Sequence, residues 1–181
     1  VKFFSGDTLN AMAERMRAKQ GALMLFVADN LKIVADSLSN LRLHLGRKLS
    51  LIDQNRYDFL WIVDFPLFEW NEDEDRYEPA HHLFTAPTDD SIQLLDTDPG
   101  NARSQHYDLV INGNEVASGS VRIHRWEIQQ KILNNLNISP EEVESRFGYF
   151  IEALQYGTPP HAGIAPGLDR LVMLMLGEEN I

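Results

Sequence analysis

Apolar positions in the first fifty residues change their spacing twice along the chain. Residues 6–18 space them as a helix does, and residues 21–29 (GALMLFVAD) form a continuous apolar run of strand length. Helical spacing returns over residues 31–49, and the predicted helix is expected to end at Gly46. We therefore predict a small mixed unit of helix and strand. It carries no convergent set of catalytic side chains, so its expected role is packing or contact with a partner.

The apolar pattern becomes strand-like after a polar break at residues 53–58. FLWIVDFPLFEW (59–70) predicts an apolar strand that Pro66 ends or kinks. The acidic run at 71–79 predicts a solvated loop. Residues 88–105 are rich in Asp, Asn, Pro and Gly, which is typical of a long surface loop with about one helical turn.

The clearest hairpin lies at residues 107–124, where alternating strand formers flank Asn112-Gly113. Asn-Gly between two such runs is a strong turn signal. Residues 126–138 and 139–157 are then expected to be helical. The second of these helices opens with a Ser-Pro-Glu-Glu start, which is typical of a capping box.

Composition narrows the classes of function. The 181 residues suffice for one domain, or for a domain with a small companion. Because the chain has no cysteine, disulfides and thiolate metal sites are excluded. The net charge of −11 argues against a broad phosphate-binding surface, but not against a nucleotide held by a few charges and a metal ion.

The sequence pattern predicts neither a membrane span nor a signal peptide, so a cytoplasmic location is the default expectation. The chain opens on Val1 rather than Met. We therefore expect it to be a piece of a longer protein.

The predicted hairpin carries charged side chains that could meet a ligand. Because side chains alternate along a strand, Ser118, Ser120 and Arg122 share one face, and the neighbouring glycine and alanine are expected to let a ligand approach the backbone. An arginine there could clamp a carboxylate at two points. Asp108 and Glu115 lie on adjacent strands and could hold Mg²⁺, which prefers one or two carboxylates plus phosphate oxygens. An ordinary solvent-facing hairpin with cross-strand ion pairs stays open as the alternative.

Two adjacent histidines, His81 and His82, precede the long connector. Neighbours on a strand point to opposite faces, and no further Cys or well-spaced His completes a zinc site. A chance pair in a surface loop and a pair of neutral donors to an anionic ligand are both open interpretations. His124 and His161 allow the same two interpretations.

The segment GIAPGLDRLVMLML (163–176) places two charges in an almost wholly apolar stretch. A helix is predicted to begin near Leu168, and unpaired N–H groups at a helix start favour anions. Arg170 in the first turn is disfavoured by the helix dipole, so it needs a partner. That partner is either a triphosphate or a carboxylate such as Asp169. The segment is not a P-loop, because it lacks the Gly-Lys-Ser/Thr ending.

The same segment resembles motif 3 of the class II aminoacyl-tRNA synthetases, in which a glycine-rich strand end leads into a helix with an essential arginine. Four further blocks are similar, in this order, to the bacterial-type aspartyl-tRNA synthetases: FLWIVDFPLFEW, HHLFT, YDLVINGNEVASGSVRIH and FGYFIEALQYGTPPHAGIAPGLDR. GALMLFVADNLKIVADSLSNLRLHLGRKL resembles the end of the GAD domain inserted in that family's catalytic domain. The resemblance implies the end of a GAD-like insertion domain at 1–53 and a C-terminal part of the catalytic domain at 54–181.

The resemblance implies an α+β fold: a class II antiparallel sheet flanked by helices, preceded by a small α+β piece of the insertion domain. It implies that L-aspartate, ATP and Mg²⁺ bind, and that the complete enzyme is an aspartate–tRNA ligase. Such an enzyme forms aspartyl-adenylate from ATP and transfers the aspartyl group to tRNA(Asp). A homodimer is implied for the complete enzyme, with no membrane partner.

By matching positions, the resemblance gives catalytic roles to three residues: Glu115, Arg122 and Arg170. It also implies an aspartate-binding set: His81, His82 and Arg122. The planar guanidinium of Arg122 would clamp the side-chain carboxylate of aspartate at two points.

The resemblance implies an ATP-binding set as well: Glu115, Gly167, Leu168, Asp169 and Arg170. Arg170 would neutralise the γ-phosphate, and Asp108 and Glu115 would hold the magnesium ion. Catalysis would then rest on positioning and on charge stabilisation of an in-line attack at the α-phosphate.

The chain departs from the family pattern at three places. Leu83 stands where proline usually follows the paired histidines, Ala117-Ser118-Gly119-Ser120 replaces a glycine run, and Pro166 occupies a variable position. The chain shows no motif 1, no motif 2 with its arginine for the α-phosphate and no anticodon-binding β-barrel, so it is expected to be inactive alone. Two alternatives stay open: a stand-alone class II-like paralogue that binds aspartate or adenylate, and a non-catalytic interaction module.

Overall fold

The chain divides into two units, Val1–Gln54 and Asn55–Ile181. The computed structural model describes residues 3–53, 55–178 and 180–181. The predicted domains come from the family resemblance, and the assignment of the first unit to an insertion domain stays a prediction. Within the described ranges, no helix combines the length and the apolar character needed to cross a bilayer.

The first unit is helical where the structure describes regular elements. α1 (Gly6–Arg15) is capped by the Ser5 side chain, and α2 (Leu31–Lys48) continues through Gly46. The predicted stop at Gly46 is wrong, because this glycine does not adopt the positive φ of a glycine C-cap. A Cβ on Gly46 would make an ordinary van der Waals contact with Ile52 Cδ1 at 3.4 Å, so the helix does not require glycine at this position.

The predicted strand at residues 21–29 is not formed. A strand needs a neighbour for its backbone N–H and C=O groups, and residues 3–53 as described hold no second strand to pair with it. Its apolar side chains are exposed, with Leu23 83% and Phe26 59% accessible. The predicted small α+β piece is therefore corrected to a helical unit over these described residues.

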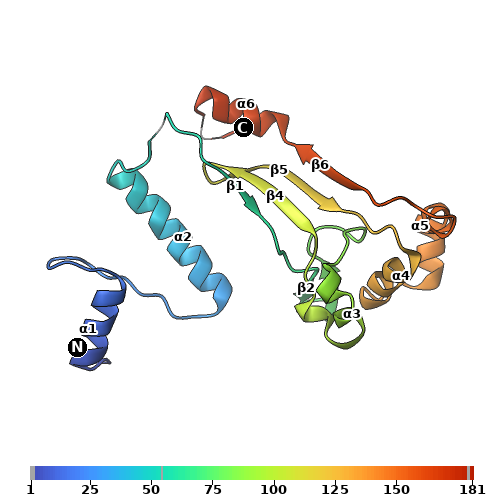
Figure 1. Cartoon of the computed structure of the whole chain (residues 1–181), viewed down its shortest axis with the longest axis horizontal. Helices are drawn as coiled ribbons and strands as arrows, with labels where there is room; N and C mark the ends of the chain where they lie inside the picture. Colours follow the sequence, from blue (N-terminus) through green and yellow to red (C-terminus); the bar gives the residue numbers. More distant parts are fainter. Residues whose placement is uncertain (1–2, 54, 179) are drawn as a thin grey trace. The chain divides into compact units, whose positions relative to one another are not determined.

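A four-stranded antiparallel sheet forms the frame of the second unit (Figure 1). In spatial order its strands are β1 (Phe59–Ile62), β4 (His106–Ile111), β5 (Asn114–Val121) and β6 (Ala162–Pro166). β4 and β5 form the predicted hairpin. The two turn residues have φ values of 50° and 84°, the positive values that a two-residue turn of this kind requires, so the Asn-Gly signal is confirmed.

A second, smaller hairpin corrects one prediction. β2 (Phe68–Asn71) pairs with β3 (Arg76–Pro79), so the acidic run at 71–79 is a turn followed by a strand rather than a loop throughout. Asn71 Oδ1 accepts hydrogen bonds from the backbone amides two and three residues on, at 3.0 and 3.1 Å. This local side-chain contact closes the turn, which charge patterning alone did not reveal.

Three longer helices complete the second unit: α4 (Trp126–Asn135), α5 (Pro140–Gln155) and α6 (Leu168–Leu176). α5 begins at the predicted cap, where Ser139 accepts a hydrogen bond from a first-turn amide. Buried side chains of α4 and α5 pack together, and α6 follows β6 at the other end of the sheet (Figure 1). The predicted antiparallel sheet with flanking helices is confirmed for this unit.

The connector at residues 88–105 is more ordered than the predicted surface loop. It contains three short helical turns: η1 (Asp89–Ser91), α3 (Leu94–Thr97) and η2 (Pro99–Asn101). Leu95 and Ala102 are only 3% and 1% exposed, and they join a core cluster with Ile132 of α4. Ile92 and Leu94 pack against the same cluster, so four apolar side chains among many turn formers anchor the connector in the core.

Candidate functional site

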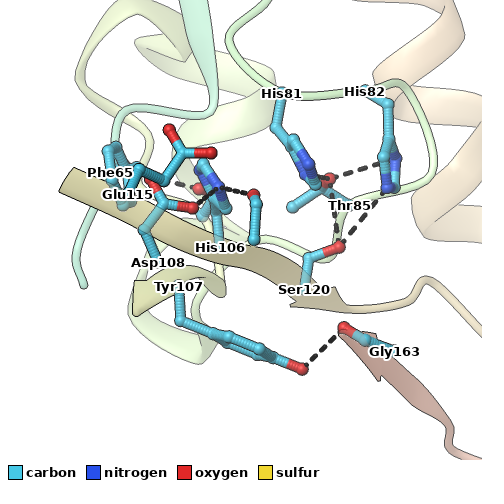
Figure 2. A network of polar contacts seen from close by, with 12 residues as sticks. Phe65, His81, His82, Thr85, His106, Tyr107, Asp108, Glu115, Ser120 and Gly163 are labelled. Carbon is cyan, nitrogen blue, oxygen red and sulfur yellow. Dashed lines mark hydrogen bonds and ion pairs between the residues drawn. The ribbon is translucent and has the colours of Figure 1, made fainter. Parts of the chain in front are cut away.

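A β-bulge decides which side chains share a face of the sheet. Asp108 pairs with Ser118, whereas Val110 pairs with Glu115, so β5 holds one extra residue, Val116. Cross-strand partners share a face, and Asp108 and Val110 share one by alternation. Glu115 therefore joins Asp108 and Ser118, as Figure 2 shows for the two carboxylates. Strict alternation along β5 would have placed Glu115 on the opposite face.

The small residue Gly119 does not make room for a ligand, contrary to the prediction. A Cβ on Gly119 would overlap the Gly163 carbonyl oxygen and lie 2.6 Å from Tyr107 Cε2. The Tyr107 hydroxyl donates to that same carbonyl at 3.0 Å, on the side of the sheet away from the histidines (Figure 2). Gly119 allows close packing of β6 instead. Ala117 is only 4% exposed but borders the pocket that Glu115 and Arg170 line.

His81 and His82 lie in the loop after β3, and both rings face the sheet (Figure 2). Their ring centroids are 4.3 Å apart. Thr85 Oγ1 lies 3.3 Å from His81 Nδ1 and 3.1 Å from His82 Nδ1, so one hydroxyl orients both rings. The opposite-face rule does not apply, because the pair is not on a strand.

Arg122 follows directly after β5 and lies beside His82. Its Nη1 donates to Ser120 Oγ at 2.7 Å, and the same nitrogen is 3.5 Å from His82 Nδ1. Ser120 is fully buried, so at this end the hairpin face is not the solvent-facing surface of the alternative interpretation. A pocket of about 350 Å³ opens here, and its walls include His82, Phe84, Arg122, Phe150 and His161. His81 is not part of this lining.

Electrostatics keep His82 neutral. The Phe84 amide donates to its Nδ1 at 3.2 Å, so that nitrogen carries a lone pair and the proton lies on Nε2. Burial, and next the charge of Arg122, lower the pKa of His82 from 6.5 to about 4. Burial also lowers the pKa of His81. At neutral pH His82 is therefore an uncharged N–H donor beside the Arg122 guanidinium.

Acid is expected to destabilise the fold through His82. Its pKa is 6.5 in the unfolded chain and about 4 in the folded one, so between these values the unfolded state binds more protons. The stability contributed by neutral His82 is complete above pH 6.5 and is lost as the pH falls toward 4. Urea unfolding of the chain across this pH interval should show a falling free energy of unfolding, and His82→Gln should make that free energy depend less steeply on pH. Replacing the exposed His44 by Gln should leave the pH dependence unchanged. An unchanged pH dependence in His82→Gln would contradict the assignment.

The predicted ATP-binding residues border a second pocket, at the other end of β5. Arg170 Nη1 donates to the Glu115 main-chain oxygen at 2.7 Å and lies 3.3 Å from Glu115 Oε1. In the described part of the chain, the acidic partner of Arg170 is thus Glu115 rather than Asp169. This pocket measures about 290 Å³, and its walls include Glu115, Gly167, Leu168, Asp169 and Arg170.

Asp108 and Glu115 suit Mg²⁺, which takes its remaining ligands from phosphate, better than they suit a metal ion that protein side chains hold alone. Among the residues that the structure describes, no three His, Asp or Glu side chains come together to hold a metal. Asp108 is 8% exposed, whereas the Glu115 side chain is 49% exposed on the same face. One or two carboxylates completed by phosphate oxygens are the set that Mg²⁺ prefers. These residues therefore fit the ion that the family resemblance implies.

His106 is a site residue that the sequence pattern did not single out. It is 8% exposed, and its Nε2 lies 2.9 Å from Asp108 Oδ1 and 3.0 Å from Ser118 Oγ. A signal was present, because His106 stands two residues before Asp108 and alternation places both on one face. The departure from the glycine run at Ser118 supplies the hydroxyl that it contacts.

Comparison with known proteins shows the family of the chain. The model of the family described as tRNA synthetases class II (D, K and N) matches residues 8–181. Aspartate–tRNA(Asp/Asn) ligases of Geotalea uraniireducens (strain Rf4) and Bacillus cereus (strain ATCC 10987 / NRS 248) are 48% and 51% identical over all 181 residues, which span 30% and 31% of their lengths. The solved aspartyl tRNA synthetase of Entamoeba histolytica is 26% identical with a TM-score of 0.51, over 94% of this chain and 28% of that one. The chain therefore belongs to the class II tRNA synthetases of the D, K and N group.

Proposed function

We propose that this chain is the C-terminal catalytic segment of an aspartate–tRNA ligase, with residues 54–181 in the catalytic domain and 1–53 in its insertion domain. The observation that supports this most is that β5 joins the two pockets. Glu115 borders one pocket and Arg122 the other. At about 3.3 Å per residue the seven-residue separation corresponds to about 23 Å along the strand, which suits aspartate at one end and a triphosphate at the other.

At one end of the strand, Arg122 and the neutral His82 bind the side-chain carboxylate of aspartate. A guanidinium offers two parallel N–H donors to a carboxylate, and the His82 Nε2–H adds a third donor without a second charge. His81 orients this pair through the shared Thr85 hydroxyl.

At the other end, Arg170 and the backbone at Gly167–Asp169 bind the ATP phosphates. Asp108 and Glu115 would hold Mg²⁺, whose charge offsets that of the phosphates. An α-carboxylate oxygen of aspartate attacks the α-phosphorus, and pyrophosphate leaves with the electron pair of the broken P–O bond. A ribose hydroxyl of tRNA(Asp) then attacks the aspartyl carbonyl, AMP leaves, and the hydroxyl proton is released. The protein contributes positioning and fixed positive charge.

The two alternative interpretations are not favoured. A stand-alone paralogue or an interaction module would not be expected to match aspartate–tRNA ligases along all of its residues, the first unit included. For the complete ligase, we also expect a homodimer and a cytoplasmic location, as the resemblance implies.

ATP–pyrophosphate exchange that depends on L-aspartate tests the proposal. The complete ligase, meaning the full-length protein that carries this segment, should catalyse the exchange; its failure to do so would refute the function. The chain alone should not, because the α-phosphate arginine of motif 2 is outside it. The chain also leaves Phe59 and Trp61 of the edge strand β1 64% and 55% exposed, which suggests a surface that further protein covers. Exchange at a normal rate by the isolated chain would show that this remainder is not needed.

A further inference from the structure

His106 lies between the two halves of the site. Its ring stacks on Phe65 on one side, with centroids 4.1 Å apart and planes at 29°. On the other side it stacks on His81, also at 4.1 Å and with the planes only 2° apart. Figure 2 shows these rings on the same face of the sheet as Asp108 and Glu115. The ring therefore fixes the plane of His81.

The hydrogen bond to Asp108 requires a proton on one nitrogen of His106. A carboxylate only accepts, so the 2.9 Å contact between Nε2 and Asp108 Oδ1 places a proton on Nε2. The same nitrogen lies 3.0 Å from Ser118 Oγ. Nδ1 is buried without a partner among the described residues. A residue chosen only for packing would not carry an unsatisfied buried nitrogen, which is costly.

We propose that His106 is a positioning residue that couples the metal side of the site to the aspartate side. Its Nε2–H binds Oδ1 of Asp108, a carboxylate that would hold Mg²⁺, and its ring face stacks on His81. The two actions use different parts of the imidazole. This inference rests on the proposed function, since Asp108 and His81 matter only if magnesium and aspartate bind here.

Two substitutions separate the two actions. His106→Gln keeps an N–H donor at a similar reach but removes the ring, and His106→Phe keeps a ring but removes the donor. His44→Gln is the matched control, because His44 is an exposed histidine in the first unit. All are measured in the complete ligase by ATP–pyrophosphate exchange, as the magnesium concentration for half-maximal rate and the KM for aspartate.

His106→Phe is expected to raise the half-saturating magnesium concentration about tenfold or more, which is the usual cost of losing a partner that orients a metal ligand. Its KM for aspartate should change little. His106→Gln should instead raise the KM for aspartate about two- to tenfold, as expected for a lost aromatic pair, with near-normal magnesium dependence. A residue with a merely structural role would move both parameters together in both variants, and that result, or no change in either, overturns the proposal.

NMR of the 181-residue chain keeps the inference separate from the proposed function. The His81 ring protons should lose their upfield ring-current shift in His106→Gln and keep it in His106→Phe. The side-chain nitrogen shifts of His106 should show a protonated Nε2. If the complete ligase shows no exchange but these signals are found, the proposed function fails while the positioning geometry stands. If the signals are absent, the inference about His106 fails on its own.

Discussion

Replacing Arg170 by Ala in the complete ligase should lower kcat/KM for aspartate-dependent ATP–pyrophosphate exchange by about 100- to 1,000-fold, the usual cost of removing one preorganised donor to a developing negative charge. Arg170 lies in the first turn of α6, where the helix dipole disfavours a cation. Its contact with Glu115 offsets this cost only in part, because both side chains are about half exposed. A triphosphate in the adjacent pocket would supply the stronger partner.

The fold should survive that substitution. An exposed ion pair is worth about 0–1 kcal/mol, so thermal unfolding of Arg170→Ala should stay near that of the unchanged ligase. Arg170→Lys is the matched variant, because it keeps the charge but loses the planar guanidinium. Its exchange rate should lie between those of the unchanged ligase and Arg170→Ala. Unchanged exchange kinetics in Arg170→Ala would contradict the phosphate-binding role and would mean that Arg170 only pairs with Glu115 at the surface.

Local signals predicted much of the second unit. Asn112-Gly113 requires positive φ at two consecutive positions, and few structures other than a tight hairpin satisfy this. The cap at Ser139 likewise fixed the start of α5. These predictions succeeded because the determining interactions lie within a few residues of one another.

Predictions that depended on distant partners failed. The apolar run at 21–29 had the composition of a strand, but in the described residues of the first unit it lacks a neighbour to complete its hydrogen bonds. The bulge at Val116 depends on the register of two strands, and period-two counting cannot detect it. Yet this bulge brings Glu115 to the face of Asp108. The family resemblance had named both carboxylates, but only the register explains how one face can hold them.

His106 illustrates a different limit. A histidine at the start of a strand is ordinary in sequence. Its importance arises from contacts with two separate segments, at Phe65 and His81, and with Asp108 on its own strand. Spacing could place it on the correct face, but not show that its ring packs against His81. Residues that position others are hard to predict, because their neighbours come from loops with no periodic pattern.

Arg122 offers the sharpest test of substrate choice. Arg122→Ala in the complete ligase should lower kcat/KM for aspartate about 100-fold or more, since two charge-assisted hydrogen bonds of about 1.5–3 kcal/mol each are lost. Arg122→Lys should lose about 10- to 100-fold, because an ammonium keeps the charge but not the fork. Burial, the largest cause of the lowered pKa of His82, still acts when Arg122 is removed, so the neutral His82 supplies no charge to compensate. Exchange assays over a range of aspartate concentrations measure both variants.

Asparagine separates a specificity role from a structural one. Its neutral side-chain amide cannot accept a two-point bond from a guanidinium, so Arg122→Ala should leave the weak exchange with asparagine nearly unchanged while exchange with aspartate collapses. Arg146→Ala, on the outer surface of α5 with a side chain 57% exposed, is the matched control and should alter neither. Equal losses of exchange with both amino acids would mean that Arg122 supports the pocket through Ser120 and does not bind the substrate carboxylate. A loss confined to aspartate would identify Arg122 as the residue that distinguishes a carboxylate from an amide.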